Sequence, residues 1–178
     1  LKYITEYYVT QNSPVYICFL DASKAFDRVN HWTLFWKLLC RGVPAILVRA
    51  LAFWYCNQTF TVRWGSTLST PFNVTNGVRQ GGILSPYLYN VYIDDLSHIL
   101  SKTQVGCYIN GVCANHLVYA DDTVILAPSA QGLQDLLHVC EVYAKKHNIV
   151  FNVKKTKCMC MKTKFLKDMY TPLIQLDN

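Results

Sequence analysis

Two aspartates stand side by side in a segment whose other residues have the composition of a protein core. Asp121 and Asp122 separate two short apolar runs within residues 116–126. Charged side chains are rarely buried unless they are paired or bind a ligand. An ordinary turn is one interpretation, because aspartate tolerates the left-handed conformation and bonds its own backbone. A second pair, Asp94 and Asp95, falls in an expected helix, so the dipeptide alone identifies no site.

A third carboxylate distinguishes the first pair from a simple turn. Asp21 ends the apolar run of residues 15–20, which is typical of a buried strand. If that strand neighbours the strands around Asp121, three carboxylates meet at one edge and repel one another. A divalent cation relieves the repulsion, and Mg²⁺ prefers such hard oxygen ligands. Two ions about 4 Å apart can stabilise the attacking and leaving oxygens of a phosphoryl transfer.

The elements that would position these carboxylates follow from local patterns. Asn30 can cap a helix that ends before Gly42, and the Asn110-Gly111 dipeptide is a strong hairpin signal. Strands mixed with helices predict an α+β fold, an antiparallel sheet with helices packed on one face. We expect helices over 31–41, 44–54, 85–100 and 133–143, and strands over 15–21, 59–64, 71–75 and on both sides of 110–111 and 120–122.

Composition restricts the class of protein. The 178 residues are 52% apolar and 16% charged, which predicts one globular domain. No apolar run reaches the 18 residues of a membrane span, and no secretory signal opens the chain. The net charge of +6 resides in residues 145–178, which carry eight lysines and two aspartates. Contact with a phosphate backbone and a solvated lysine-rich surface both explain that charge.

The eight cysteines predict reduced thiols in an intracellular protein. No CxxC pair is present, and Cys107, Cys113 and His116 lack a credible fourth zinc ligand. Most of the cysteines have apolar neighbours, among which a free thiol behaves as a small hydrophobe; these are Cys18, Cys40, Cys56, Cys107, Cys113 and Cys140.

Four segments resemble, in order, motifs A, B, C and D of reverse transcriptases. They are FLDASKAFD (19–27), NGVRQGGILSP (76–86), YADD (119–122) and NVKKTKC (152–158). Their style is closest to non-LTR (LINE-like) retrotransposon polymerases, and group II intron or retron enzymes fit less well. The resemblance implies a polymerase palm over residues 1–178, with fingers and thumb largely missing.

The resemblance also implies roles for the carboxylates and for one lysine. Asp21 and Asp121 would be metal ligands, and Asp122 would complete the acidic cluster. The cofactor would be two Mg²⁺ ions, with Mn²⁺ as a substitute. Lys155 matches the motif D lysine, a candidate proton donor to the leaving pyrophosphate.

Other positions would contact nucleotide or template. Phe26 matches the steric gate, where a ring blocks a ribose 2′-hydroxyl; simple packing is the alternative. Arg79 and Gln80 would line the nucleotide and template pocket, where Gly81 lets the backbone approach a ligand closely. Tyr119 would pack against the primer or serve as an ordinary strand tyrosine.

Two further motif A residues, Lys24 and Asp27, are expected to be structural.

The leading hypothesis is a fragment of an RNA-directed DNA polymerase that adds deoxynucleotides to a primer 3′-OH and is inactive alone. Its partners would be RNA template, DNA primer and deoxynucleoside triphosphate, with no membrane. The parent would supply fingers, thumb and a possible endonuclease, in the nucleus or cytoplasm. The alternative is a non-catalytic or co-opted palm that binds nucleic acid or a partner protein.

Overall fold

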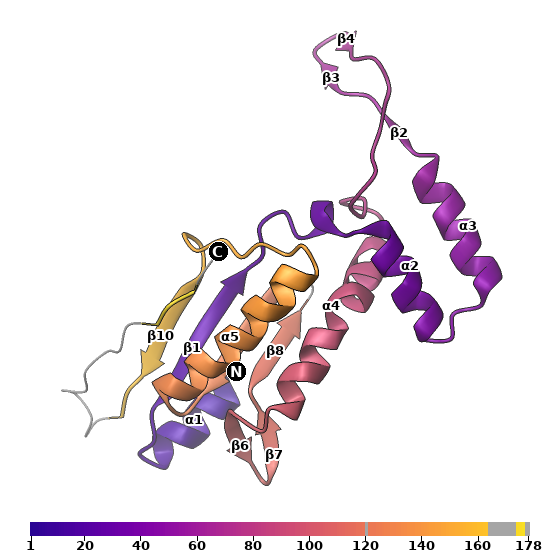
Figure 1. Ribbon diagram of the computed structural model, residues 1–178. Coiled ribbons are helices and arrows are strands. Elements are labelled where there is room, and N and C mark those ends of the chain that lie inside the picture. The colour runs from indigo at the N-terminus through magenta and orange to yellow at the C-terminus, as the bar shows by residue number, and fades with distance from the viewer. Residues whose placement is uncertain (120, 164–173, 177–178) are drawn as a thin grey trace. The chain divides into compact units, whose positions relative to one another are not determined.

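The computed structural model describes residues 1–119, 121–163 and 174–176 (Figure 1). The chain forms two compact units. Unit 1 comprises residues 1–25 and 93–178, and unit 2 comprises residues 26–92. Much of the predicted lysine-rich end, residues 164–173, lies outside the described residues. Each unit is considered by itself.

Unit 1 is built on a four-stranded antiparallel sheet, as the sequence predicts. The strand order is β10-β1-β9-β8, so the strand that ends in Asp21 is the direct neighbour of the strand that begins with Asp122. Strands β1 and β10 lie side by side in Figure 1. The strands are β1 (Val15–Asp21), β8 (His116–Tyr119), β9 (Asp122–Ala127) and β10 (Lys157–Met161).

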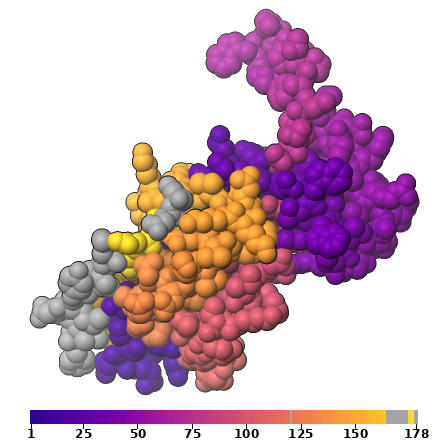
Figure 2. All heavy atoms as spheres, in the orientation of Figure 1, coloured from indigo at the N-terminus to yellow at the C-terminus, as the bar shows by residue number. Residues whose placement is uncertain are grey.

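Helix α5 (Ala130–Lys146) covers one face of this sheet. Ser129 caps it by accepting a hydrogen bond from the Gly132 amide, and its last turn is basic, which suits the helix dipole. The apolar face expected from the spacing is fully buried; it comprises Leu133, Leu136, Leu137, Cys140 and Tyr143. In Figure 2 the orange atoms of α5 hide the strands behind them.

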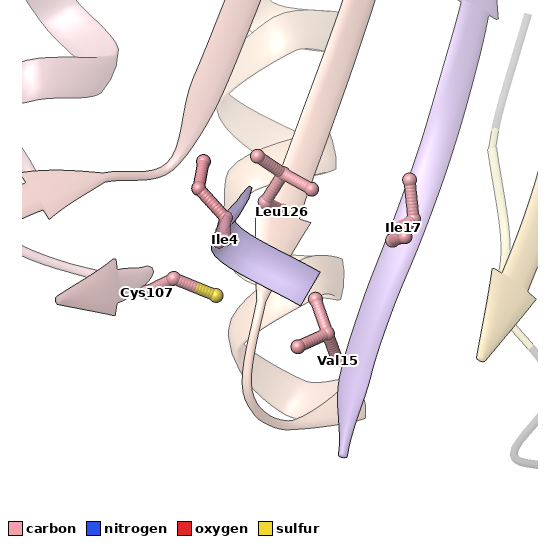
Figure 3. Close-up of a cluster of buried hydrophobic side chains, with 5 residues drawn as sticks. All are labelled: Ile4, Val15, Ile17, Cys107 and Leu126. Carbon is pink, nitrogen blue, oxygen red and sulfur yellow. The ribbon is translucent and has the colours of Figure 1, made fainter. Parts of the chain in front are cut away.

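Helix α1 (Lys2–Thr10) packs near one end of the opposite face. Side chains alternate between the faces of a strand, so Ile17 and its cross-strand partner Leu126 share a face that excludes Cys18. Ile4 of α1 packs on that pair with Val15 and Cys107 (Figure 3). The chain therefore adds a short helix opposite the expected one.

A hairpin and a long helix complete unit 1. Strands β6 (Cys107–Ile109) and β7 (Val112–Ala114) pair across Asn110 and Gly111, both at positive φ, which confirms the predicted hairpin. Helix α4 (Ser85–Lys102) begins in unit 2 and ends in unit 1.

Unit 2 contains a 3-10 turn (Phe26–Arg28), helices α2 and α3, the start of α4, and a long hairpin whose outer strand pair encloses an inner pair. Helix α2 (His31–Cys40) is capped by Asn30, whose side chain accepts from the Thr33 amide at 2.9 Å, as predicted. Helix α3 (Ala45–Cys56) packs against it, with the Tyr55 ring edge-on to His31. The expected pairing between residues 59–64 and 71–75 is confirmed over two residues on each side. The short strands are β2 (Thr59–Phe60) with β5 (Phe72–Asn73) and β3 (Arg63–Trp64) with β4 (Thr67–Leu68).

The cysteines are free thiols with unequal surroundings. Cys18, Cys107 and Cys140 are buried, as expected of small hydrophobes. The same expectation is wrong for Cys40 and Cys56, which are exposed because each ends a helix. None of the helices in the described part of the chain is long and apolar enough to cross a membrane.

The sheet register makes a prediction about thiol reactivity. Cys18 lies opposite Cys158, and its hydrogen bond lowers the pKa of the Cys158 thiol. Because the thiolate is the reactive form, Cys18→Ala should raise that pKa and move the alkylation profile of Cys158 to higher pH. Mass spectrometry after iodoacetamide labelling at a series of pH values measures this shift.

Cys160 on the same strand is the internal reference, because its thiol hydrogen-bonds Tyr16 and not Cys18. Burial raises the pKa of the Cys160 thiol in both proteins. Its profile should be the same in both proteins. If the Cys158 profile were also unchanged, the pairing of β1 with β10 in this register would be wrong.

Candidate functional site

A row of three side chains crosses the end of the sheet in unit 1. Asp21 lies opposite Asp122, and Asp122 lies opposite Tyr119 on the next strand. Directly opposite residues of antiparallel strands project from the same face. The register therefore brings a predicted metal ligand, Asp21, onto one face with Asp122 of the predicted acidic cluster and with the predicted primer-contacting tyrosine. We call Tyr119, Asp122 and Asp21 the acidic row.

The face that carries the acidic row is open at this end. The neighbouring row, two residues away on each strand, is Leu117, Val124 and Phe19. Phe19 and Leu117 are each 37% exposed, whereas Ile17 one step further is buried beside α1. The carboxylates thus border an apolar surface that solvent, or a ligand, can reach.

Asp121 occupies the tight connection between β8 and β9. Tyr119 pairs with Asp122, and Asp121 immediately precedes β9; Ala120 lies outside the described residues. Asp121 and Asp122 are both exposed. Within the described residues, no group of three or more histidine, cysteine or acidic side chains is assembled to hold a metal ion. The register thus places the acids at one sheet edge without closing them around a common point.

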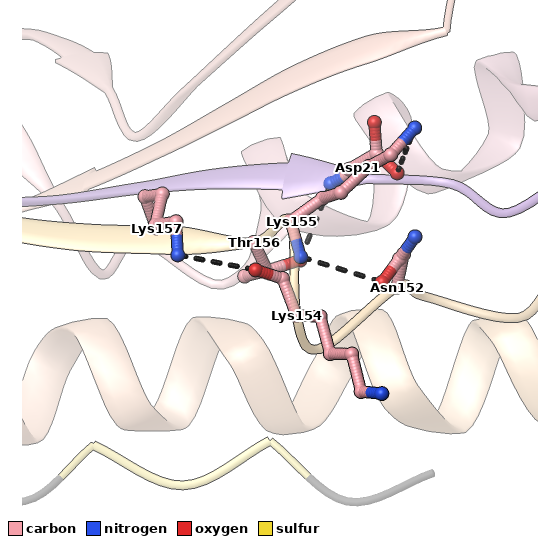
Figure 4. Close-up of polar contacts among 6 residues, drawn as sticks. All are labelled: Asp21, Asn152, Lys154, Lys155, Thr156 and Lys157. Atoms are coloured by element: carbon pink, nitrogen blue, oxygen red, sulfur yellow. Dashed lines mark hydrogen bonds and ion pairs between the residues drawn. The ribbon is translucent and has the colours of Figure 1, made fainter.

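The turn before β10 is attached to Asp21 by its backbone and its lysine (Figure 4). The Asn152 amide donates to the Asp21 carbonyl at 2.7 Å, and the Asp21 amide donates to Thr156 Oγ1 at 3.3 Å. Lys155 Nζ lies 4.0 Å from Asp21 Oδ2. The two side chains are 70% and 38% exposed, so this ion pair contributes little stability and can be exchanged for another partner.

The neighbouring lysines behave differently from Lys155. Lys157 Nζ donates to the carbonyl of Lys154 at 3.1 Å, within the same turn. Lys155 is thus the motif D lysine that forms an ion pair with a predicted metal ligand, Asp21.

In unit 2 the predicted nucleotide-binding residues lie on one tight turn. The Gly82 amide donates to the Arg79 carbonyl at 3.0 Å, which closes a β-turn with Gln80 and Gly81 at its centre. Gly81 has φ +79°, the conformation that this third turn position requires and that glycine adopts without strain. The Ser85 hydroxyl also donates to the Arg79 carbonyl at the start of α4. Arg79 and Gln80 are exposed on this turn.

Motif A is bound to motif B inside unit 2. The Gly77 amide donates to the Val29 carbonyl at 2.7 Å, and the Val78 amide donates to the Phe26 carbonyl at 2.8 Å. A Cβ on Gly77 would lie 2.9 Å from the Asp27 backbone, so only glycine allows this approach. His31 Nε2 lies 2.7 Å from the Gly77 carbonyl oxygen.

These contacts surround a pocket of about 530 Å³ in unit 2. Its walls come from motif A, motif B and the base of the hairpin, and include Asp27, His31, Phe60, Asn76, Arg79 and Gln80. Gln80 Nε2 donates to Asp27 Oδ1 at 3.3 Å beside it. The volume falls within the range typical of small-molecule sites.

The family model described as reverse transcriptase (RNA-dependent DNA polymerase) matches residues 4–167 of the chain. The chain belongs to the reverse transcriptase family. All four motifs predicted from the sequence fall within the matched residues.

The similar proteins include polymerases of retrotransposons. A probable RNA-directed DNA polymerase from transposon X-element of Drosophila melanogaster is 34% identical over 152 residues, 82% of this chain and 16% of that protein. The Pol polyprotein of the retrotransposable element R2DM from the same species is 34% identical over 68% of this chain and 11% of its own length. These relatives confirm the predicted non-LTR type. The chain spans less than a fifth of their length.

The fold is also that of a region of a solved telomerase. Apo telomerase from Candida tropicalis, truncated from its C-terminal domain, superposes with a TM-score of 0.61 at 16% identity. The match covers 90% of this chain and 34% of the telomerase chain. The predicted α+β, palm-like fold class is therefore confirmed.

Two motif A residues of this reverse transcriptase domain, Phe26 and Asp27, make contacts that bear on their expected roles. The Phe26 ring packs on the Tyr89 ring, with centroids 5.0 Å apart, so the packing alternative is satisfied and the steric-gate role stays a prediction. Asp27 was expected to be structural only, yet its side chain contacts Gln80. The signal available in the sequence was that Asp27 is the one acidic residue in 26–92.

Gly77 and Gly81 provide a matched test of the motif A and motif B contact. Both have positive φ, but only Gly77 has backbone in the place of a Cβ. We expect Gly77→Ala to lower the free energy of unfolding by about 3 kcal/mol, and Gly81→Ala by about 1 kcal/mol from strain alone. Thermal and urea unfolding measure both; equal losses would show that the Asp27 backbone does not lie against Gly77.

Proposed function

We propose that the chain is the catalytic palm of an RNA-directed DNA polymerase of the non-LTR retrotransposon type. The reaction is attack of a primer 3′-hydroxyl on the α-phosphorus of a deoxynucleoside triphosphate, with pyrophosphate as the leaving group. The observation that carries the proposal is the acidic row, in which the register pairs Asp21 with Asp122 on an open face. The family supplies the template class, RNA, and the product class, DNA.

The donor set at the acidic row suits divalent magnesium. Asp21, Asp121 and Asp122 offer carboxylate oxygens at neighbouring strand ends, and Mg²⁺ binds through one or two such groups plus water and phosphate. Asp21 and Asp121 would be the ligands, with Asp122 completing the negative field. When bound, two Mg²⁺ ions, or Mn²⁺ in their place, supply charge stabilisation to the transferring phosphoryl group.

Lys155 is suited to move a proton or charge at the leaving group. Its ammonium is held near Asp21 by a weak, solvent-exposed ion pair. Such a pair is readily exchanged, and a triphosphate offers the ammonium a stronger anionic partner. Lys155 would then protonate or neutralise the departing pyrophosphate.

The turn of motif B supports nucleotide and template contact. Arg79 and Gln80 are exposed on a turn fixed by Gly81, directly before the N-terminus of α4. Unit 2 has one acidic residue against six arginines and lysines, so it favours a polyanion. Tyr119 is 84% exposed in the acidic row, where its ring is available for stacking on a nucleotide.

The alternative, a palm that binds nucleic acid or a partner without catalysis, differs in one observable. It predicts binding of RNA–DNA duplex with no Mg²⁺-dependent extension. Retention of the three carboxylates favours catalysis.

In the full-length parent polymerase, Asp121→Ala should reduce primer extension to background, because it removes a predicted metal ligand from an exposed turn without disturbing the core. The measurement is Mg²⁺-dependent incorporation of deoxynucleotides on an RNA template, with circular dichroism as the folding check. Asp94→Asn, in the exposed part of α4, is the matched loss of a carboxylate and should leave extension unchanged. Normal extension by Asp121→Ala would refute the proposed site.

In the full-length parent polymerase, Phe26→Val should increase incorporation of ribonucleotides relative to deoxynucleotides by about ten-fold or more, because a smaller side chain leaves room for the 2′-hydroxyl. The ratio is measured within one protein, so the stability lost with the Phe26–Tyr89 contact cancels. An unchanged ratio would leave Phe26 as a packing residue.

A further inference from the structure

Asp27 is an unexpected residue for the pocket of unit 2. It is the one acidic residue among residues 26–92, which otherwise carry six basic side chains. A carboxylate beside a pocket for a triphosphate repels that ligand. A favourable contact of Asp27 would offset this repulsion.

The contact of Asp27 is with Gln80, one of the predicted nucleotide-binding residues. Gln80 Nε2 donates to Asp27 Oδ1 at 3.3 Å. Both side chains are exposed, so water competes for this bond, and its net contribution to stability is small. The main effect of this hydrogen bond is to select one conformation of the Gln80 side chain.

The backbones that carry the two residues are already fixed. Two hydrogen bonds join residues 26–29 to residues 77–78, and Gly77 lies against the Asp27 backbone. The turn of Gln80 is closed separately by the Gly82 amide. Because the main chain holds the two side chains within reach, only their own rotamers remain to be ordered.

The chemistry of the pair decides which end of the Gln80 amide meets a ligand. An ionised carboxylate only accepts hydrogen bonds, so it binds the NH₂ end of the amide. Oε1 is then left as the acceptor available in the pocket. Gln80 can therefore accept a hydrogen bond from a donor group of the ligand, such as a sugar hydroxyl or a base amino group.

We propose that Asp27 is a positioning residue for Gln80, which it holds with Oε1 available to a donor group of the bound nucleotide. This inference rests on the proposed function, since it takes the ligand to be a deoxynucleoside triphosphate. Asp27 acts through Gln80, so its role is positioning and not catalysis.

The test is a set of variants measured for binding of dATP with Mg²⁺ by isothermal titration calorimetry. Asp27→Ala removes the acceptor and should raise the Kd for dATP about ten-fold, despite the loss of a repelling charge. Asp27→Asn keeps an acceptor, Oδ1, and loses the charge, so it should bind as tightly as the native chain or a few-fold more tightly. If Asp27 were only a repelling charge, both variants would bind more tightly than the native chain, which would overturn the proposal.

A double-mutant cycle separates positioning from general damage to the fold. Gln80→Ala should weaken binding about ten-fold, and adding Asp27→Ala to it should leave the Kd unchanged or lower it a few-fold, because only the repelling charge is then lost. Full additivity of the two losses would overturn the proposal, because Asp27 would then act independently of Gln80. Unfolding temperatures of the four proteins verify that each is folded.

The outcomes for the proposed function and for this inference are distinct. If the native chain binds no dATP, the proposed function fails and the positioning role fails with it. If the native chain binds dATP and Gln80→Ala weakens binding while Asp27→Ala does not, only the positioning role is overturned.

Discussion

The pairing of β1 with β9 is the constraint on which the site depends. In this register Asp21 is opposite Asp122, and every other pair along the two strands follows from that one. A shift by one residue would turn Asp21 and its row to the face covered by α5 and would expose buried residues such as Cys18 and Leu20. The hydrophobic core of unit 1 therefore enforces the register that brings the carboxylates together. Stability and chemistry are coupled through the same set of strand pairs.

The two faces of the sheet differ in how far helices cover them. Helix α5 covers one face, and α1 covers only part of the other, so the sheet end with the acidic row stays open. The turn of Lys155 is bound to the Asp21 backbone by two hydrogen bonds, which keeps a cation at the edge of the row. In unit 2, the approach of Gly77 to Asp27 similarly binds motif A to motif B. Backbone contacts thus set positions, and exposed polar side chains are left to act.

Local signals in the sequence predicted most of the elements. The Asn30 cap, the Asn110-Gly111 turn and the apolar spacing of α5 each depend on a few neighbouring residues, and all three are confirmed. The order of the motifs indicated the family before the fold was known. The convergence of Asp21 with the Asp121 turn was a conditional prediction, which needed the strands to be neighbours; that Asp122 is the residue directly opposite Asp21 requires the register.

Features that depend on long-range packing were not predictable in the same way. The exposure of Cys40 and Cys56 follows from where their helices end on the surface, which apolar neighbours in the sequence do not reveal. The bond between Asp27 and Gln80 joins residues 53 positions apart. The shared face of Tyr119 and the carboxylates likewise requires the register of three strands.

The most direct test of the metal site is anomalous diffraction from crystals of the chain soaked in Mn²⁺. We predict Mn²⁺ bound by carboxylate oxygens of Asp21 and Asp121, at the end of the sheet that carries the acidic row. Asp94 and Asp95, an equally acidic dipeptide in α4, provide the comparison within the same crystal. Manganese bound at the helix pair, with none at the acidic row, would contradict a two-metal polymerase site at this edge of the sheet.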